Sequence, residues 1–285
     1  MKIFYNHNKH WIAAAALIIA ALSLILLQFI PAIWPSKTNK LIVESKSIAD
    51  IFSYIKPDEY NQSTCIVFDI DNTLARPHGH LGSDQWFNWS VKLYEKQGMA
   101  RKKAVDEIIM PRLLQFMAHS WLEPVEPNTP AVIKELQEKG VMVVALTARS
   151  LDLTYRTIEQ LAHIGITFAG TGPRNCPIAY GEGKPALYID GIIFSGHHKK
   201  GEVLTHWFDQ IDYHPKKIIF IDDGLKNIES VQRALADHNY SFIGIRYGYL
   251  DNYIKTVTPK IIAQEYKEFM DTFPESRPIT TMPAY

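Results

Sequence analysis

Five polar side chains that could carry out phosphoryl transfer stand at the ends of apolar runs in the sequence. They are Asp69, Asp71, Thr147, Asp222 and Asp223. Because parallel strands end at a shared edge of a sheet, side chains in these places meet in one crevice. Four carboxylates in one crevice repel one another unless a divalent cation joins them, and oxygen ligands alone suit Mg²⁺. The pattern therefore predicts a magnesium-assisted phosphoryl-transfer site.

Each of these side chains has an expected role in that chemistry. Asp69 would attack phosphorus as a carboxylate nucleophile and form an aspartyl-phosphate. Asp71 would protonate the leaving oxygen and later take a proton from the hydrolytic water. Thr147 would hold a phosphoryl oxygen through its hydroxyl group. Lys200, at the start of a predicted helix, would supply positive charge, and Lys199 takes its place if that helix begins one residue earlier.

The elements that must position these residues follow from the apolar pattern. Four short apolar runs predict strands buried on both faces; they are 65–68, 141–146, 217–221 and 242–245. Helical patterns lie between them. The alternation predicts an α/β fold with a Rossmann-like parallel sheet covered by helices. The apolar segment 188–194, with Asp190-Gly191 at its centre, predicts a β-hairpin.

The ordered motifs resemble those of the haloacid dehalogenase superfamily. An Asp-x-Asp-x-Thr segment, a Thr, a Lys and an Asp-Asp pair follow one another within residues 65–231. The resemblance implies that Asp69 is the nucleophile, Asp71 the acid and base, and that Thr147 and Lys200 bind phosphate. It also implies that Mg²⁺ is held by Asp69, Asp222 and the backbone carbonyl of Asp71, with Asp223 nearby or acting through water.

Individual residues indicate the subtype within this superfamily. The dehalogenases lack the second aspartate, which this chain has as Asp71, and the transport ATPases carry Lys there and continue Thr-Gly-Thr, where this chain has Asn72-Thr73. Both departures indicate phosphomonoester hydrolysis. Segments 82–87 and 200–204 resemble a bacterial helical-capped group without settled function, some of whose members are membrane-associated and similar to protein phosphatases. A phosphotyrosine phosphatase, a small-molecule phosphatase such as a nucleotidase, and a catalytically inactive membrane-anchored adaptor all remain open.

The long segment between the first two motifs predicts an inserted domain. Residues 75–140 far exceed an ordinary loop, and Trp86, Trp89 and Tyr94 recur at helical spacing. We expect a small helical cap there, with the catalytic core formed by residues 47–74 and 141–285. Arg149, close to the second motif, is expected either to contact substrate or to form a structural ion pair.

The N-terminal region predicts a membrane anchor. Residues 11–34 carry no charge, and a helix of that length rises about 36 Å, enough to cross a hydrocarbon layer of about 30 Å. Residues 1–10 would be a flank and 35–46 a linker, which makes the chain a single-pass membrane protein. A cleaved signal peptide is the alternative, and the side of the membrane on which the body lies stays open.

Composition limits the partners. With 30 basic and 30 acidic residues, the chain lacks the positive charge with which proteins bind nucleic acid. Two cysteines exclude a disulfide framework and a four-cysteine zinc site. The expected partners are a phosphorylated substrate and a membrane.

Overall fold

The computed structural model describes residues 40–170, 172–178, 180 and 185–273. The compact unit that contains them begins at Lys40, and residues 1–39 form a separate unit. The predicted flank (1–10) and membrane anchor (11–34), and residues 35–39 of the predicted linker, lie outside the described residues. Among the residues that are described, no helix combines the length and the apolar character needed to cross a bilayer.

An eight-stranded, mostly parallel sheet forms the centre of the described unit, in the order β1-β10-β9-β2-β5-β8-β7-β6. Neighbouring strands from β1 to β8 run parallel, and β8, β7 and β6 continue antiparallel. The strands are β1 (Lys40–Ser45), β2 (Thr64–Phe68), β5 (Met142–Thr147), β6 (Cys176–Ile178), β7 (Ala186–Ile189), β8 (Ile192–Phe194), β9 (Lys217–Asp222) and β10 (Ser241–Tyr247). The predicted α/β class is confirmed, and the four predicted strands are β2, β5, β9 and β10.

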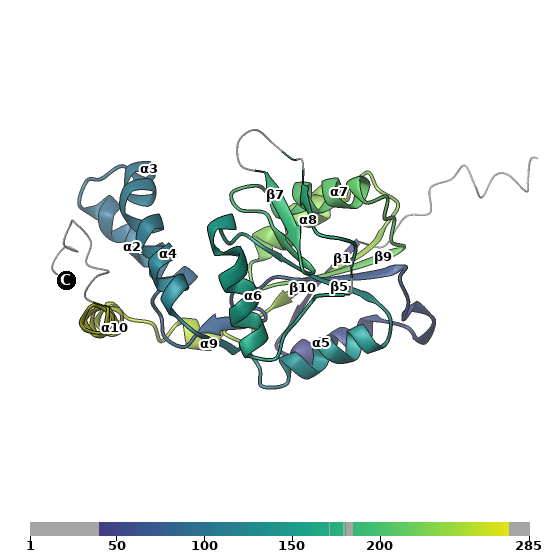
Figure 1. Cartoon of the computed structure of the whole chain (residues 1–285), viewed down its shortest axis with the longest axis horizontal. Helices are drawn as coiled ribbons and strands as arrows, with labels where there is room; N and C mark the ends of the chain where they lie inside the picture. Colours follow the sequence, from purple (N-terminus) through teal and green to yellow (C-terminus); the bar gives the residue numbers. More distant parts are fainter. Residues whose placement is uncertain (1–39, 171, 179, 181–184, 274–285) are drawn as a thin grey trace, which may run out of the picture. The chain divides into compact units, whose positions relative to one another are not determined.

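The strands form where the apolar runs predict them because both faces of the sheet are covered. Every residue of β2, β5 and β9 is buried. Alternate side chains enter two apolar clusters, Ile66 and Phe68 on one face and Cys65 and Val67 on the other. Helix α5 (Thr129–Glu138) covers the first face, and α7 (Lys200–Gln210) with α8 (Leu225–Ala234) covers the second (Figure 1). Helix α6 (Thr154–His163) adds Leu161 to the first cluster.

The predicted hairpin is present as β7 and β8. Asp190 and Gly191 connect these strands with φ values of 49° and 79°. Positive φ at both central residues is the conformation of the turn type that suits a two-residue hairpin, and it explains the Asp-Gly pair.

The linker predicted at 35–46 ends earlier than expected. Residues 40–45 form β1, an edge strand that pairs in parallel with β10, with Leu41 opposite Ile243 and Val43 opposite Ile245. Three consecutive apolar residues are a weak strand signal when they are read alone. The strand forms because β10 offers an open edge, so the core begins at residue 40 rather than 47.

A helical layer follows β2, as the insertion predicts, but it is shorter than 75–140. It lies between the paired strands β3 (Ala75–Pro77) and β4 (Leu122–Pro124), and its helical segments are α2 (Asp84–Lys96), α3 (Arg101–Ala104), a π-helical turn (Val105–Ile109) and α4 (Met110–His119). Residues 129–138 of the expected cap instead form α5 on the sheet. We call residues 78–121 the cap.

The C-terminal helix α10 (Pro259–Thr272) also packs on the cap, although its residues were expected in the core. Ile262 is buried in the cap's apolar cluster, and Phe269 meets Phe116 of α4 edge-on at a ring-centroid distance of 4.8 Å. The remaining elements are short: α9 (Asp251–Ile254) and the 3₁₀ helices Ile48–Tyr54, Pro57–Glu59 and Leu151–Leu153.

Candidate active site

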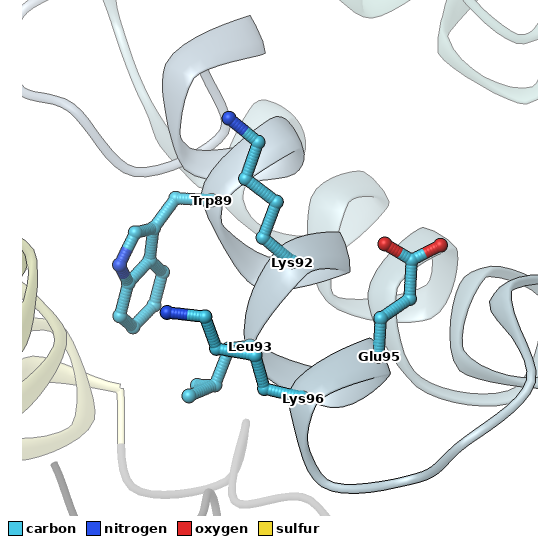
Figure 2. A pocket seen from close by; sticks show the side chains of 5 residues that line it. All are labelled: Trp89, Lys92, Leu93, Glu95 and Lys96. Carbon is cyan, nitrogen blue, oxygen red and sulfur yellow. The ribbon is translucent and has the colours of Figure 1, made fainter.

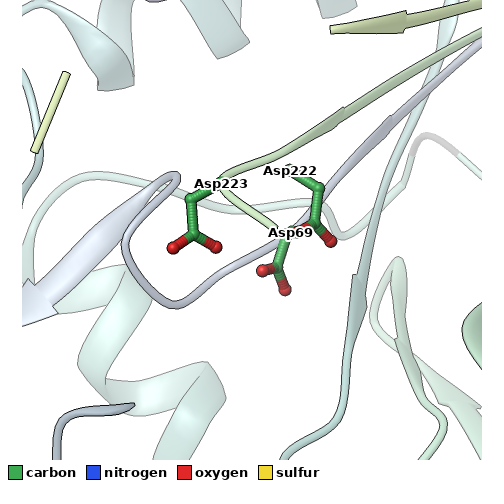
Figure 3. Close-up of side chains that lie close together, drawn as sticks. All are labelled: Asp69, Asp222 and Asp223. Carbon is green, nitrogen blue, oxygen red and sulfur yellow. The ribbon is translucent and has the colours of Figure 1, made fainter. Parts of the chain in front are cut away.

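Two adjacent strands bring the carboxylates of Asp69, Asp222 and Asp223 together. Phe68 at the end of β2 pairs with Ile221 of β9, so the residues that follow both strands emerge at the same level. The Asp69 backbone N–H donates to the carbonyl oxygen of Ile221 at 2.9 Å. One side-chain oxygen from each of the three aspartates lies within 4.8 Å of the others (Figure 3). The structure thus brings together three of the four predicted carboxylates.

Lys200 lies between two of these carboxylates, those of Asp69 and Asp222. Its Nζ is 2.6 Å from Oδ1 of Asp69 and 2.7 Å from Oδ2 of Asp222, and its side chain is 6% exposed. Lys200 is the first residue of α7. Lys199 is the exposed N-cap residue of that helix, and its Nζ pairs with Glu202 at 2.8 Å. Of the two alternatives, Lys200 is therefore the lysine that reaches the carboxylates.

Asp222 is held by donors on both of its oxygens. Besides the ammonium of Lys200, its carboxylate accepts from the Gly224 backbone N–H at 2.7 Å and from the Asn227 amide at 2.9 Å. The side chain has no exposed surface. Because buried carboxylates need such partners, Asp222 is a rigid part of the site. The hydroxyl oxygen of Thr73 accepts from the Asp223 backbone N–H at 3.1 Å and so ties the first motif to the last.

The electrostatics of the three carboxylates favour the entry of a cation. Burial and the neighbouring charge of Asp222 raise the pKa of Asp69 well above its ordinary value, although Lys200 opposes the shift. Burial and Asp222 also raise the pKa of Asp223 to about 7. A divalent cation would reduce the repulsion between the carboxylates that raises these pKa values. The donor set consists of oxygen atoms, so it fits Mg²⁺.

Asp71 lies beside this cluster and its side chain is engaged elsewhere. Its Oδ1 and Oδ2 accept from Nη2 and Nε of Arg149 at 2.7 and 2.9 Å. Arg149 is buried, and its Nη1 donates to Gln160 at 2.9 Å and to Thr157 at 3.2 Å. Of the two roles expected for Arg149, the structure shows the ion pair. Its partner is the predicted acid and base rather than a residue remote from the site.

Thr147 is the last residue of β5 and is 1% exposed. Its Oγ1 accepts from the Arg149 backbone N–H at 3.1 Å, and a hydroxyl that accepts in this way retains its own hydrogen for donation. Its carbonyl oxygen accepts from both the backbone N–H and the hydroxyl of Ser195, at 2.8 and 2.9 Å. Thr147 and Asp71 are thus connected to each other through Arg149.

Two residues near the site were not predicted. The amide of Asn72 is 3.4 Å from a carboxylate oxygen of Asp84, the first residue of α2. Desolvation between cap and core and the charge of Asp71 raise the pKa of Asp84 to about 6. In the sequence, Asp84 looks like an ordinary residue at the start of a helix, because Ser83 is the N-cap. Its position beside Asp71 in the structure identifies it as a residue near the site.

In the described part of the chain, two cavities are lined by side chains of α2. One, of about 230 Å³, lies at Asp71 and Arg149 between α2, α4 and the segment after β5. The other, of about 500 Å³, lies along α2 and is lined by Trp89, Lys92, Leu93, Glu95 and Lys96 (Figure 2). None of the predicted site residues lines this second cavity, and we place no function there.

Comparison with known proteins assigns the chain to a family. Residues 44–275 match the family model described as "Protein of unknown function (DUF2608)". The chain belongs to this family. A "Putative outer membrane protein" of Chlamydia muridarum is 28% identical over 234 residues, which cover 82% of this chain and 87% of the relative. An "Uncharacterized protein" of Rickettsia bellii is 21% identical, and the match covers 79% of this chain and 82% of the relative.

Solved structures resemble the chain more distantly. The class C acid phosphatase of Bacillus anthracis aligns with a TM-score of 0.34 and 16% identity, over 78% of this chain and 81% of that one. A phosphoserine phosphatase solved as a phospho-aspartyl intermediate analogue aligns with a TM-score of 0.36 and 16% identity, over 70% of this chain and all of that one. Similarity at this level does not transfer an activity.

Proposed function

We propose that this protein is a Mg²⁺-dependent phosphomonoester hydrolase that works through an aspartyl-phosphate. The observation that carries the proposal is the ammonium of Lys200 between the buried carboxylates of Asp69 and Asp222, with Asp223 beside them, at the ends of adjacent parallel strands. This arrangement offers a nucleophile, a fixed cation and an oxygen-only metal site in one place.

In the first half-reaction, a carboxylate oxygen of Asp69 attacks phosphorus while the bond to the leaving oxygen breaks. Asp71, as a carboxylic acid, gives its proton to that oxygen and the alcohol departs. In the second half-reaction, water attacks the phosphorus of the aspartyl-phosphate and loses a proton to Asp71. The bond between phosphorus and Asp69 breaks, which releases inorganic phosphate and restores both carboxyl groups.

Charge and orientation come from the surrounding groups. Lys200 would neutralise negative charge on the phosphoryl oxygens, and the hydroxyl of Thr147 would donate to one of them. Asp69, Asp222 and the backbone carbonyl of Asp71 would hold Mg²⁺, with Asp223 as a ligand directly or through water. The bound cation would screen the repulsion between an anionic nucleophile and an anionic phosphate.

The test is Asp69→Asn in the purified full-length chain, assayed with p-nitrophenyl phosphate and Mg²⁺. We expect turnover to fall to background, because the amide is a far weaker nucleophile, and chelation of Mg²⁺ to abolish wild-type turnover until the cation is restored. Asp237→Asn is the matched control, since Asp237 is exposed and lies before β10, at the amino end of the strands. Unchanged turnover in Asp69→Asn contradicts the proposal.

The intact Asp71 and Lys200 disfavour the inactive adaptor. A panel that includes phosphotyrosine and phosphoserine peptides and nucleoside monophosphates separates the remaining alternatives. Activity on the peptides supports a protein phosphatase, activity on the nucleotides supports a nucleotidase, and no activity on any substrate supports the adaptor.

We also propose that residues 11–34 attach the chain to a membrane as a single span. The length of the uncharged stretch supports the span, and the name of the chlamydial relative supports membrane association alone.

A further inference from the structure

The cavity of about 230 Å³ beside Asp71 has walls of unusual composition for a site that handles phosphate. Apolar side chains from the cap and from the turn after β5 form most of its lining. They are Phe87 of α2, Met110, Leu113, Leu114 and Met117 of α4, Ala148 directly after β5, and Leu153 of the 3₁₀ helix Leu151–Leu153. The cap therefore presents an apolar surface toward the acid and base.

The charged groups of this cavity do not suit a second anionic group on the substrate. Arg149 supplies the cation in the described lining, and its guanidinium already donates to Asp71, Thr157 and Gln160. Asp71 and Asp84 line the same cavity and add negative charge. A carboxylate or a second phosphate would meet these acids and would lose its water without gaining a partner.

The position of Asp71 identifies which part of a substrate enters the cavity. A group that protonates the leaving oxygen must reach that oxygen within hydrogen-bond distance. The carbon skeleton attached to that oxygen then extends from Asp71 into the space that Asp71 lines. A neighbouring cavity of about 330 Å³ shares Met110, Ala148 and Ser150 with this one, so longer groups have room beyond.

We propose that this cavity is the leaving-group subsite and that it selects phosphomonoesters of compact, apolar alcohols or phenols. The inference rests on the proposed hydrolase activity and deepens it. Burial of the apolar group between α2 and α4 provides binding energy, and the acids at the cavity discriminate against polar, anionic metabolites.

The test compares a series of n-alkyl phosphates from ethyl to hexyl with the full-length protein. The acidity of the released alcohol is nearly constant along this series, so chain length changes mainly the apolar surface that is buried. We expect kcat/KM to rise about fourfold for each added methylene until the cavity is filled. Benzyl phosphate tests an aromatic group, and glycerol phosphate and phosphoserine, which are polar or charged, are expected to be poor substrates.

A variant within the cavity tests the same surface. Leu114 is half-buried and belongs to none of the apolar clusters among the described residues, so Leu114→Gln changes the lining with little effect on folding. We expect it to lower the ratio of kcat/KM between hexyl and ethyl phosphate by about tenfold. Leu93→Gln is the matched control, because Leu93 is a half-buried cap leucine that lines the other cavity (Figure 2), and the ratio should not change.

The outcomes separate this inference from the proposed function. If none of the phosphate esters, including p-nitrophenyl phosphate, is hydrolysed, the proposed function is wrong and so is the assignment of the subsite. If the esters are hydrolysed but kcat/KM is flat or falls with chain length, the hydrolase stands and the apolar subsite is wrong. A slope that persists unchanged in Leu114→Gln also contradicts the assignment to this cavity.

Discussion

The ion pair with Arg149 fixes the orientation of Asp71, the residue proposed as the acid and base. Both carboxylate oxygens of Asp71 accept from one planar guanidinium, which fixes the plane of the carboxylate as well as its position. The side-chain oxygen of Gln160 accepts a hydrogen bond from Nη1 of Arg149. The amide nitrogen of Gln160 donates to the carbonyl oxygens of Met117 and Ser120 at the end of α4, at 2.8 Å each. Asp71 is therefore connected to the cap through the side chains of Arg149 and Gln160, and in the proposed mechanism Arg149 would be a positioning residue.

Replacing Arg149 by lysine tests this role. Lysine keeps the positive charge but cannot donate two parallel hydrogen bonds as the guanidinium does, so the plane of the Asp71 carboxylate is no longer fixed. We expect kcat for ethyl phosphate, a poor leaving group that needs a proton, to fall about 10²-fold, and kcat for p-nitrophenyl phosphate to fall less than about tenfold. Arg156→Lys on the same helix as Gln160 is the control and should affect neither substrate. An equal loss for both substrates would mean that Arg149 has only a structural role.

The packing of α7 against α8 places the lysine of the site. Gly201 follows Lys200, and a Cβ atom at this position would lie 2.5 Å from the carbonyl oxygen of Ser230 and 2.8 Å from Cβ of Ala234. Ser230 and Ala234 belong to α8, which follows the strand that carries Asp222. Glycine at 201 thus allows the start of α7, and with it Lys200, to approach the carboxylates.

Gly201→Ala is expected to lower the free energy of unfolding by about 1–3 kcal/mol, because the new methyl group overlaps backbone atoms that cannot move alone. Urea denaturation followed by circular dichroism measures this change. Glycine-to-alanine replacement inside a helix otherwise stabilises by up to about 1 kcal/mol. An unfolding midpoint that rises instead of falling would show that α7 and α8 separate without cost.

At the scale of the whole molecule, the chain divides into two units, residues 1–39 and residues 40–285. The compact unit starts at Lys40, where β1 completes the edge of the sheet beside β10. The two ends of this unit contribute to different parts of it, since β1 extends the sheet while α10 packs on the cap. All residues of the candidate site therefore belong to the unit that begins at Lys40.

We expect the full-length chain to stay in the membrane fraction after extraction at alkaline pH, because a span of about 20 apolar residues holds a protein in the bilayer. Deletion of residues 1–39 should release the protein in a form that retains phosphatase turnover. The measurements are the sedimentation of the full-length chain and of the deletion variant with the membrane fraction, and the phosphatase turnover of each. Extraction of the full-length chain at alkaline pH would rule out the single span.

Much of the fold and of the site could be predicted because the signals are local. An apolar run such as 217–221 predicts a buried strand whatever surrounds it, and strand direction then places Asp222 and Asp223 at the carboxyl edge. The ordered appearance of Asp69, Thr147 and Asp222 along the chain was sufficient to predict that their strands end together. These predictions need only backbone direction and the alternation of strands with helices.

Other features depend on contacts between segments that are far apart in the sequence, and such contacts could not be predicted from local sequence patterns. Whether Lys199 or Lys200 reaches the site depends on where α7 starts, since one residue turns a helix by about 100°. The pairing of Arg149 with Asp71 and the attachment of α10 to the cap depend on surfaces that meet only after folding. The residues able to do chemistry were thus evident from their order along the chain, whereas tertiary packing decided which of them touch and what kind of cavity they face.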